Sequence, residues 1–320
     1  MTRQSRRWTS LSAPRAATLL FAALTARATP ATAQACCAGG ALVSPVRLAP
    51  PDDYALGLQT RVRSDMGSFL PDGTYVSTPT SSEQDVEQDL AASFRLARRA
   101  QVGIVLPYVE THRTAPGVDE WGSGIGDVAL NARYDFKLAA EMTYWPGFAL
   151  LGGVVFPTGK AVGDGTNPAA TDATGTGTFN ASLGIDLEKV HGPLYGALNL
   201  WATYSGSSST PGPAGTITTS YPLQLTALAV AGYVFENEAA VALYVNFLER
   251  GDTTVESATS NGPAPGTDLR LTTIGATGLV PVAVDWRLSV SIYADVLASS
   301  FGRNEQAGMG GTVSLVHAWR

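Results

Sequence analysis

The stretch Asp127–Leu138 reads Asp-Val-Ala-Leu-Asn-Ala-Arg-Tyr-Asp-Phe-Lys-Leu, and the rest of the chain can be interpreted from it. Every second position is apolar, and most positions between are charged or polar. The apolar positions are Val128, Leu130, Ala132, Tyr134, Phe136 and Leu138. A period of two predicts a strand with one apolar and one polar face. In a soluble protein the apolar face would pack on a core, whereas in a membrane barrel it would face lipid and the polar face would line the lumen.

The same alternation recurs along the chain and predicts twelve strands. They are expected at residues 54–63, 89–97, 101–111, 127–138, 148–156, 179–187, 194–204, 223–235, 239–248, 269–280, 286–296 and 310–319. Long and short connections alternate, so the long ones would gather at one end of the sheet. Outer-membrane barrels have this arrangement, with long outer loops and short periplasmic turns. The expected fold class is therefore all-β: a single transmembrane antiparallel β-barrel over residues 54–320. A soluble secreted β-sandwich would explain the alternation but not the sorted loops.

Residues 1–35 have the features of a cleaved secretory signal peptide. Arg3, Arg6 and Arg7 form a basic start, an apolar run follows from Ala16 to Ala26, and small residues end at Ala35. The apolar run is too short to span a bilayer as a helix. Secretion and the barrel pattern together predict the outer membrane of a Gram-negative bacterium as the location. Residues 36–53 are expected to be a periplasmic lead-in.

The charge balance argues against a nucleic-acid partner. The signal peptide holds five basic residues and no acidic ones, which leaves the mature chain with 16 bases, 27 acids and a net charge of −11. Such a chain would be repelled by phosphate backbones. The long loops hold twelve of the acids, among them Glu83 and Asp85, and are either simply solvated or bridged by divalent cations to anionic outer-membrane lipid.

The two cysteines, Cys36 and Cys37, lie at the expected mature start. Two thiols cannot form a disulfide framework, so Cys36 is either lipidated or one of a simple, oxidisable pair. The three histidines are far apart in sequence and do not have metal-ligand spacing. No nucleophile motif accompanies them. We therefore expect no metal, no cofactor and no enzymatic activity.

The polar faces of the strands supply the candidate site residues. Charged side chains expected in the lumen are Arg61, Arg63, Arg95, Asp127, Arg133, Asp135, Asp186, Arg270, Arg287 and Asp295. They either neutralise one another structurally or form a selective constriction. The long segment Pro157–Gly177 is rich in Gly and Thr and is a candidate gating loop. Its candidate residues are Thr158, Gly159, Lys160, Gly163, Gly165 and Thr166.

Three segments carry a family resemblance: Gly124–Tyr134, Val154–Lys160 and Gly175–Phe179, with the Cys-Cys-Ala-Gly-Gly start at residue 36 adding to it. The chain resembles the outer-membrane transporters named for the MetA pathway of phenol degradation, which are similar to long-chain fatty-acid channels. The resemblance implies a barrel that passes small hydrophobic or aromatic compounds by passive diffusion, without catalytic residues.

The expected partners are outer-membrane lipid, a small hydrophobic solute and the barrel-assembly machinery. Such barrels usually end on an aromatic residue, but here Arg320 follows Trp319. Two other functions remain open besides the channel. The chain could be a structural or adhesive surface barrel with a sealed lumen, or a soluble secreted β-sandwich.

Overall fold

Twelve antiparallel strands close into a barrel in the computed structural model, which describes residues 47–212, 215–257 and 261–320. The expected signal peptide and the cysteine pair lie outside these residues. The barrel strands are β1 (Tyr54–Phe69), β3 (Ser82–Ala97), β4 (Ala100–Ala115), β6 (Val128–Lys137), β7 (Gly147–Phe156), β8 (Asn180–His191), β9 (Leu194–Ser205), β12 (Gln224–Val234), β13 (Ala240–Arg250), β16 (Leu269–Ala283), β17 (Trp286–Asp295) and β19 (Gln306–Trp319). The predicted fold class, a 12-stranded antiparallel barrel, is confirmed.

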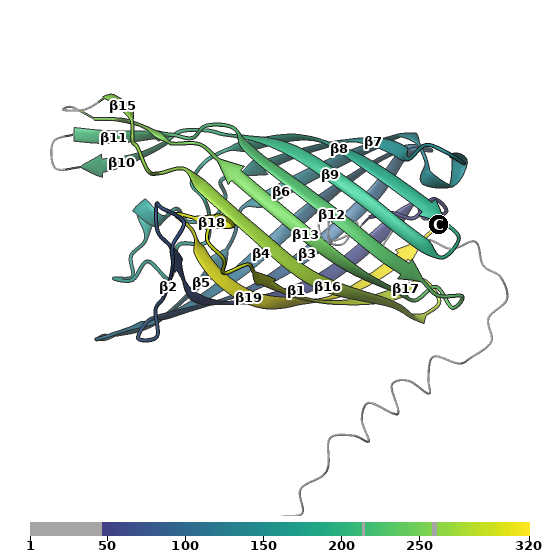
Figure 1. The fold of residues 1–320 in the computed structure, drawn as a ribbon, viewed down its shortest axis with the longest axis horizontal. Coiled ribbons are helices and arrows are strands. Elements are labelled where there is room, and N and C mark those ends of the chain that lie inside the picture. The colour runs from purple at the N-terminus through teal and green to yellow at the C-terminus, as the bar shows by residue number, and fades with distance from the viewer. Residues whose placement is uncertain (1–46, 213–214, 258–260) are drawn as a thin grey trace, which may run out of the picture.

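Each barrel strand pairs with the next barrel strand in sequence, and the pairing of the last strand with the first closes the ring. β1 pairs with β19, with Tyr54 opposite Trp319, and β13 pairs with β16, with Ala240 opposite Leu279. The short turns and both ends of the barrel sequence therefore lie at one end, the short-turn end. The opposite, long-loop end lies on the left of Figure 1.

The long-loop end contains more strand structure than the sequence predicted. β2 (Tyr75–Ser77), β5 (Val118–Ile125) and β18 (Gly302–Arg303) extend the barrel sheet. A second sheet, β10 (Ser208–Gly212), β11 (Gly215–Ser220), β14 (Thr254–Glu256) and β15 (Asn261–Pro263), projects beyond it (Figure 1). Two short 3-10 turns, η2 (Ala139–Glu141) and η3 (Val162–Asp164), lie in connections. In the added first half of β3, residues 82–88, every position but Val86 is polar, so the alternation disappears while backbone pairing continues.

The barrel is apolar outside and largely polar inside. On β13, Val241, Leu243 and Val245 are exposed on the outer surface. Acidic side chains such as Asp89, Asp186 and Asp295 are buried within the barrel instead. A soluble sheet protein has the opposite arrangement, whereas membrane barrels present an apolar band to lipid.

Aromatic side chains gather at the short-turn end of the outer surface. The ring of Tyr54 stacks on Trp319 with centroids 6.1 Å apart, and His317 lies between Trp319 and Trp286 at 5.0 and 4.6 Å. Phe94 meets Tyr54 edge-on. Aromatic belts of this kind mark the membrane interface in barrels.

Candidate functional site

The candidate site is the barrel lumen, whose long-loop half holds a cavity of about 950 Å³. Residues from nearly all the barrel strands line it, as do Ala173, Thr174, Gly175 and Thr176 of the long connection between β7 and β8. That connection therefore turns inward and forms part of the cavity wall.

One wall of the cavity is charged. Glu83, Asp85, Glu87 and Asp89 occupy alternate positions of β3, so all four point into the barrel. Arginines of the neighbouring strands β1 and β4 line the cavity beside this column of acidic side chains. Glu83 and Asp85 were expected among the acids of a long loop; they belong to an inward strand face, because β3 begins earlier than predicted.

Each arginine of this wall is held by carboxylates. Arg61 binds Glu87. The Arg63 Nε lies 2.9 Å from Asp65 Oδ1, and its Nη2 lies 3.3 Å from Asp295 Oδ2. Because an isolated, partly buried charge would be costly, pairing of this kind favours arginines on the lumen wall.

The wall half-way round the ring is aromatic and apolar. It comprises Trp201 on β9, Leu228 on β12 and Tyr244 on β13, and Tyr293 of β17 continues it towards Arg61. The rings lie directly against glycines of adjacent strands. A Cβ built at Gly184 would be 2.6 Å from the Trp201 indole, and one at Gly275 would be 2.4 Å from the Tyr244 ring. The glycines therefore let the rings lie close to the wall.

This apolar wall continues towards the short-turn end. Buried inward side chains there form one contiguous cluster: Tyr195, Ala197, Leu228, Val230, Val234, Ala240, Ala242 and Tyr244. We call this cluster the apolar track. Sequence reasoning assigned a polar inner face throughout and missed it. The available signal was that residues 227–234 are almost uniformly apolar, which means that both faces of β12 are apolar.

A charged belt lies on the inner face of β6 and β8, on the short-turn side of the cavity. Arg133 contacts Asp135 at 2.8 Å, Asp186, and Glu188 at 3.7 Å. Arg47 places its Nη2 2.9 Å from Glu188 Oε2. The structure thus brings together three of the lumen candidates, Arg133, Asp135 and Asp186, and adds Arg47 and Glu188, which lie 141 residues apart in sequence.

Two further candidates, Arg95 and Arg287, bind the segment that precedes β1. Arg95 donates to the carbonyls of Asp52 and Ala49, at 2.7 and 2.5 Å. The guanidinium of Arg287 lies 3.1 Å from Asp52 Oδ2. The predicted lead-in is therefore at least partly inside the barrel mouth, rather than free in the periplasm.

Asp127 anchors the candidate gating loop. Its two carboxylate oxygens accept hydrogen bonds from the backbone amides of Gly159, at 2.9 Å, and Thr176, at 2.7 Å. Thr158 donates through its hydroxyl to the carbonyl of Gly126, at 2.9 Å. The two ends of the loop are thereby fastened beside the start of β6.

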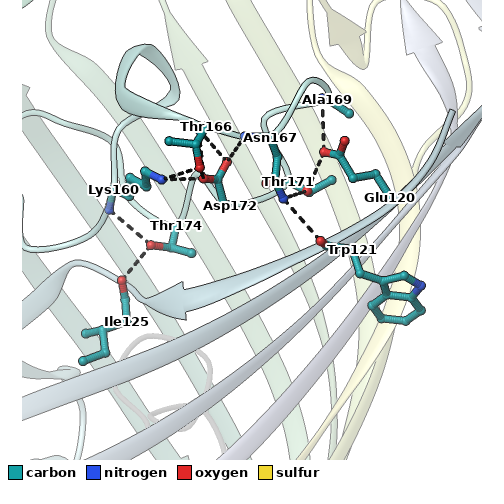
Figure 2. Close-up of polar contacts among 10 residues, drawn as sticks. All are labelled: Glu120, Trp121, Ile125, Lys160, Thr166, Asn167, Ala169, Thr171, Asp172 and Thr174. Atoms are coloured by element: carbon teal, nitrogen blue, oxygen red, sulfur yellow. Dashed lines mark hydrogen bonds and ion pairs between the residues drawn. The ribbon is translucent and has the colours of Figure 1, made fainter.

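The middle of the loop is docked against β5, as Figure 2 shows. Glu120 accepts hydrogen bonds from Ala169 N and from the Thr171 hydroxyl, at 3.1 and 2.8 Å. Thr174 donates to the carbonyl of Ile125 at 2.7 Å. The glycine-rich sequence made this segment a candidate gating loop, and these contacts give its middle a defined structure.

A smaller polar cluster shapes the loop itself (Figure 2). Asp172 binds Lys160 and accepts hydrogen bonds from the amide and hydroxyl of Thr166, at 2.9 and 2.7 Å. The Lys160 ammonium and the Thr166 donors hold the pKa of Asp172 well below its ordinary value. Gly163 and Gly165, which are also candidates, lie in the same part of the loop. A Cβ at Gly163 would touch Thr210 of β10.

Arg270 is the one lumen candidate that the structure places elsewhere. It lies opposite Glu249 in the β13–β16 ladder and binds that carboxylate at 2.5 Å. Both lie an even number of residues from the exposed Val245 and Ile274 on their strands, so their side chains point to the outer face. The prediction was wrong because the charged pair lies near the long-loop end, where outward residues need no longer be apolar.

Within the described ranges, no group of three or more His, Cys, Asp or Glu side chains is arranged so that it could hold a metal ion. No helix of that part of the chain is long and apolar enough to cross a membrane.

No protein-family model and no curated protein matches the sequence. The fold is similar to that of an outer membrane channel from Pseudomonas putida F1, with 15% identity over 84% of this chain and 96% of that one and a TM-score of 0.70. The TodX monoaromatic hydrocarbon channel matches with 12% identity over 88% of this chain and 94% of that one, and a TM-score of 0.47. The translocator domain of the autotransporter NalP from Neisseria meningitidis matches with 9% identity over 95% of this chain and 93% of that one, and a TM-score of 0.43. The fold is that of an outer-membrane β-barrel.

Proposed function

We propose that this barrel is a channel of the Gram-negative outer membrane that passes small hydrophobic or aromatic compounds by passive diffusion. Its partners are then the membrane lipid around the apolar band, the solute in the lumen and the machinery that inserts barrels. The proposal requires no cofactor, metal or catalytic residue.

The apolar track is the observation that supports the solute class. The apolar track is the larger of two buried apolar clusters in the described part of the barrel, and the smaller one, at Ala55, Ala91 and Ala318, consists mainly of alanines. On the other strands the buried inward residues are mostly Ser, Thr and Asp. A small apolar molecule entering the cavity would meet the faces of Trp201, Tyr244 and Tyr293. Contact with these rings removes apolar surface from water, which favours binding at each step along the wall.

The similarity to the Pseudomonas putida channel supports a channel role. The polar wall opposite the track suits the same role, because it keeps water in the lumen and lets a solute leave the apolar surface again. Ligand sites commonly combine an apolar surface with a few polar groups that orient the molecule.

A structural barrel with a sealed lumen is the second candidate function, and the charged belt favours it. Arg133, Asp186 and Glu188 form a charged cluster on the inner wall between the cavity and the short-turn end, and Arg47 joins this cluster to the segment inside the mouth. Opposite charges that cross-link the interior would narrow any path through it.

Growth of a deletion strain on a panel of aromatic and aliphatic carbon sources distinguishes the two functions. A channel predicts slower growth on at least one apolar compound at limiting concentration, restored by the wild-type gene. Leu228→Asn places an amide in the apolar track and should restore growth poorly, whereas Thr226→Asn, on the same inward face, should restore it fully. Equal growth of the deletion and parent strains on every compound would support the sealed barrel.

A further inference from the structure

The segment before β1 lies inside the short-turn mouth of the barrel. Leu48 and Ala49 are 4% and 0% exposed, although they precede the first barrel strand. Leu48 packs in one cluster with Ala55, Ala91 and Ala318, which are inward residues of β1, β3 and β19. The segment therefore folds back into the lumen instead of extending away from Tyr54.

Side chains from widely separated strands hold this segment. Arg95 of β3 and Gln101 of β4 bind its backbone, at Ala49 O and Leu48 N. Glu188 of β8 binds Arg47, and Arg287 of β17 binds Asp52. β8 lies five strands from β1 round the ring, so residues 47–52 cross the lumen rather than follow one wall.

The way in which the segment is held allows it to move as a unit. Residues 47–52 form no strand, and the contacts described above come from barrel side chains. Backbone pairing to the barrel begins at Asp53, whose amide donates to Trp319 O and whose carbonyl accepts from Arg95 N. Residues 47–52 could therefore move out of the barrel mouth without breaking hydrogen bonds between barrel strands. Asp53 would be the hinge of this movement.

The position of the segment determines what it would control. The cavity opens in the long-loop half, and the apolar track leads from it towards Val234 and Ala240 at the short-turn end. Residues 47–52 and the charged belt lie across the end of that path. A solute in the cavity would therefore meet this segment before it reached the periplasm.

We propose that residues 47–52 are a hinged plug that closes the periplasmic mouth of the lumen and must leave its seat for solute to pass. This inference rests on the proposed channel function. The plug reconciles a segment held inside the barrel mouth with transport, since a few polar contacts hold it there and a moving segment can break and re-form them.

A reversible tether tests the plug in the full chain. The variant carries Leu48→Cys and Ala91→Cys in a background of Cys36→Ser and Cys37→Ser, so that the new pair provides the only thiols. Single-channel current is recorded in planar bilayers, and mass spectrometry verifies the disulfide. We expect a loss of conductance when the tether is oxidised and its return when reductant is added, with the background protein insensitive to both.

A second variant removes contacts that hold residues 47–52 in the barrel mouth and uses no tether. Arg95→Ala combined with Arg287→Ala should raise the fraction of time that the channel is open. Arg303→Ala, which removes an arginine paired with Asp268 at the opposite end, is the matched control and should not. An unchanged gel-mobility shift on heating would show that each variant has folded.

The outcomes separate the plug from the channel function. Equal conductance of the oxidised and reduced tether, in a background protein that conducts, would overturn the plug and leave the channel intact. If neither the background protein nor the Arg95→Ala/Arg287→Ala variant conducts, both the plug and the channel fail.

Discussion

Single residues on β6 show how one strand serves two environments. Leu130 is 40% exposed on the outer face, and its neighbour Asn131 faces the lumen beside Gly153. The first side chain contacts lipid in a membrane barrel and the second contacts water or polar groups. Changing the polarity of the side chain should therefore affect the free energy of unfolding very differently at the two positions.

We predict that Leu130→Arg lowers the free energy of unfolding by about 2–4 kcal/mol if the residue lies near the midplane. Asn131→Ala should cost less than about 0.5 kcal/mol, as is usual for a site outside a packed core. Urea titration in lipid vesicles, followed by the gel-mobility shift, measures both. Equal costs, or the reverse order, would show that the two faces had been assigned wrongly.

Trp201 depends on the absence of a side chain at Gly184. The indole lies so close to this glycine that a methyl group there would overlap it. Gly184→Ala should therefore push the indole into the cavity and reduce single-channel conductance. Gly152→Ala is the matched control, because a Cβ at that position meets nothing within 4 Å. A fall of the same size in both variants would mean that the position of the indole does not set the conductance.

At the scale of one element, the 157–177 loop combines anchored ends with a docked middle. Asp127 fixes Gly159 and Thr176, and Glu120 fixes Thr171. Because Ala173 to Thr176 line the cavity, the loop narrows the entrance without belonging to the barrel wall. Its role as a gate remains a prediction.

Deleting Ala161–Thr174 should widen the entrance and raise conductance or solute uptake. The barrel ladders on both sides are unaffected by the deletion, so the mobility shift on heating should persist. Asp164→Ala, a change at an exposed position of the same loop, serves as the control for a change of charge alone. Unchanged permeability in a folded deletion variant would remove the gating role and leave the lumen charges as the candidate filter.

The pKa of Asp172 predicts how the loop responds to acid. Hydrogen bonds from Lys160 and Thr166 lower this pKa in the folded state. The resulting stabilisation is fully present above the unfolded value of about 3.9 and is lost as the pH falls through the lower folded value. Protease cleavage within the loop should therefore stay constant from pH 7 to about pH 4. Asp172→Asn, which weakens the bond to Lys160, should raise cleavage across that whole range. A rise of the wild-type rate already between pH 6 and 5 would contradict this assignment.

For the whole molecule, closure of the ring is the property with the clearest solution test. Twelve ladders, including those of β1 with β19 and β13 with β16, leave no open barrel edge. A closed barrel resists detergent until it is heated. Unboiled protein from the membrane fraction should therefore migrate faster on a denaturing gel than boiled protein. Identical mobility, with the protein in the soluble fraction, would exclude a membrane barrel.

The charge of the whole chain also has a structural consequence. Several acids that the sequence analysis placed in solvated loops, such as Glu83 and Asp85, line the cavity instead. Arg61 and Arg113, from the two neighbouring strands, pair with Glu87 and Glu83 of this acidic wall. The acids at the long-loop end are therefore divided between solvent and the lumen.

The sequence by itself determined the class of fold, the number of barrel strands and the direction in which most side chains point. These properties are local: a period of two fixes the face of each residue from its immediate neighbours, as in Asp127–Leu138. Strand starts such as residues 54, 194 and 286 agree with the structure for the same reason.

Only the tertiary structure decided which inward charges meet and where the apolar track, the docked loop and the lumen-crossing segment lie. Arg47 and Glu188 are partners across 141 residues, and Arg270 pairs with Glu249 outside the lumen. Such contacts depend on how far the strands are offset as the ring closes, which no local pattern records. Alternation assigns a side chain to a face, whereas ring closure and the path of the chain decide what it touches there.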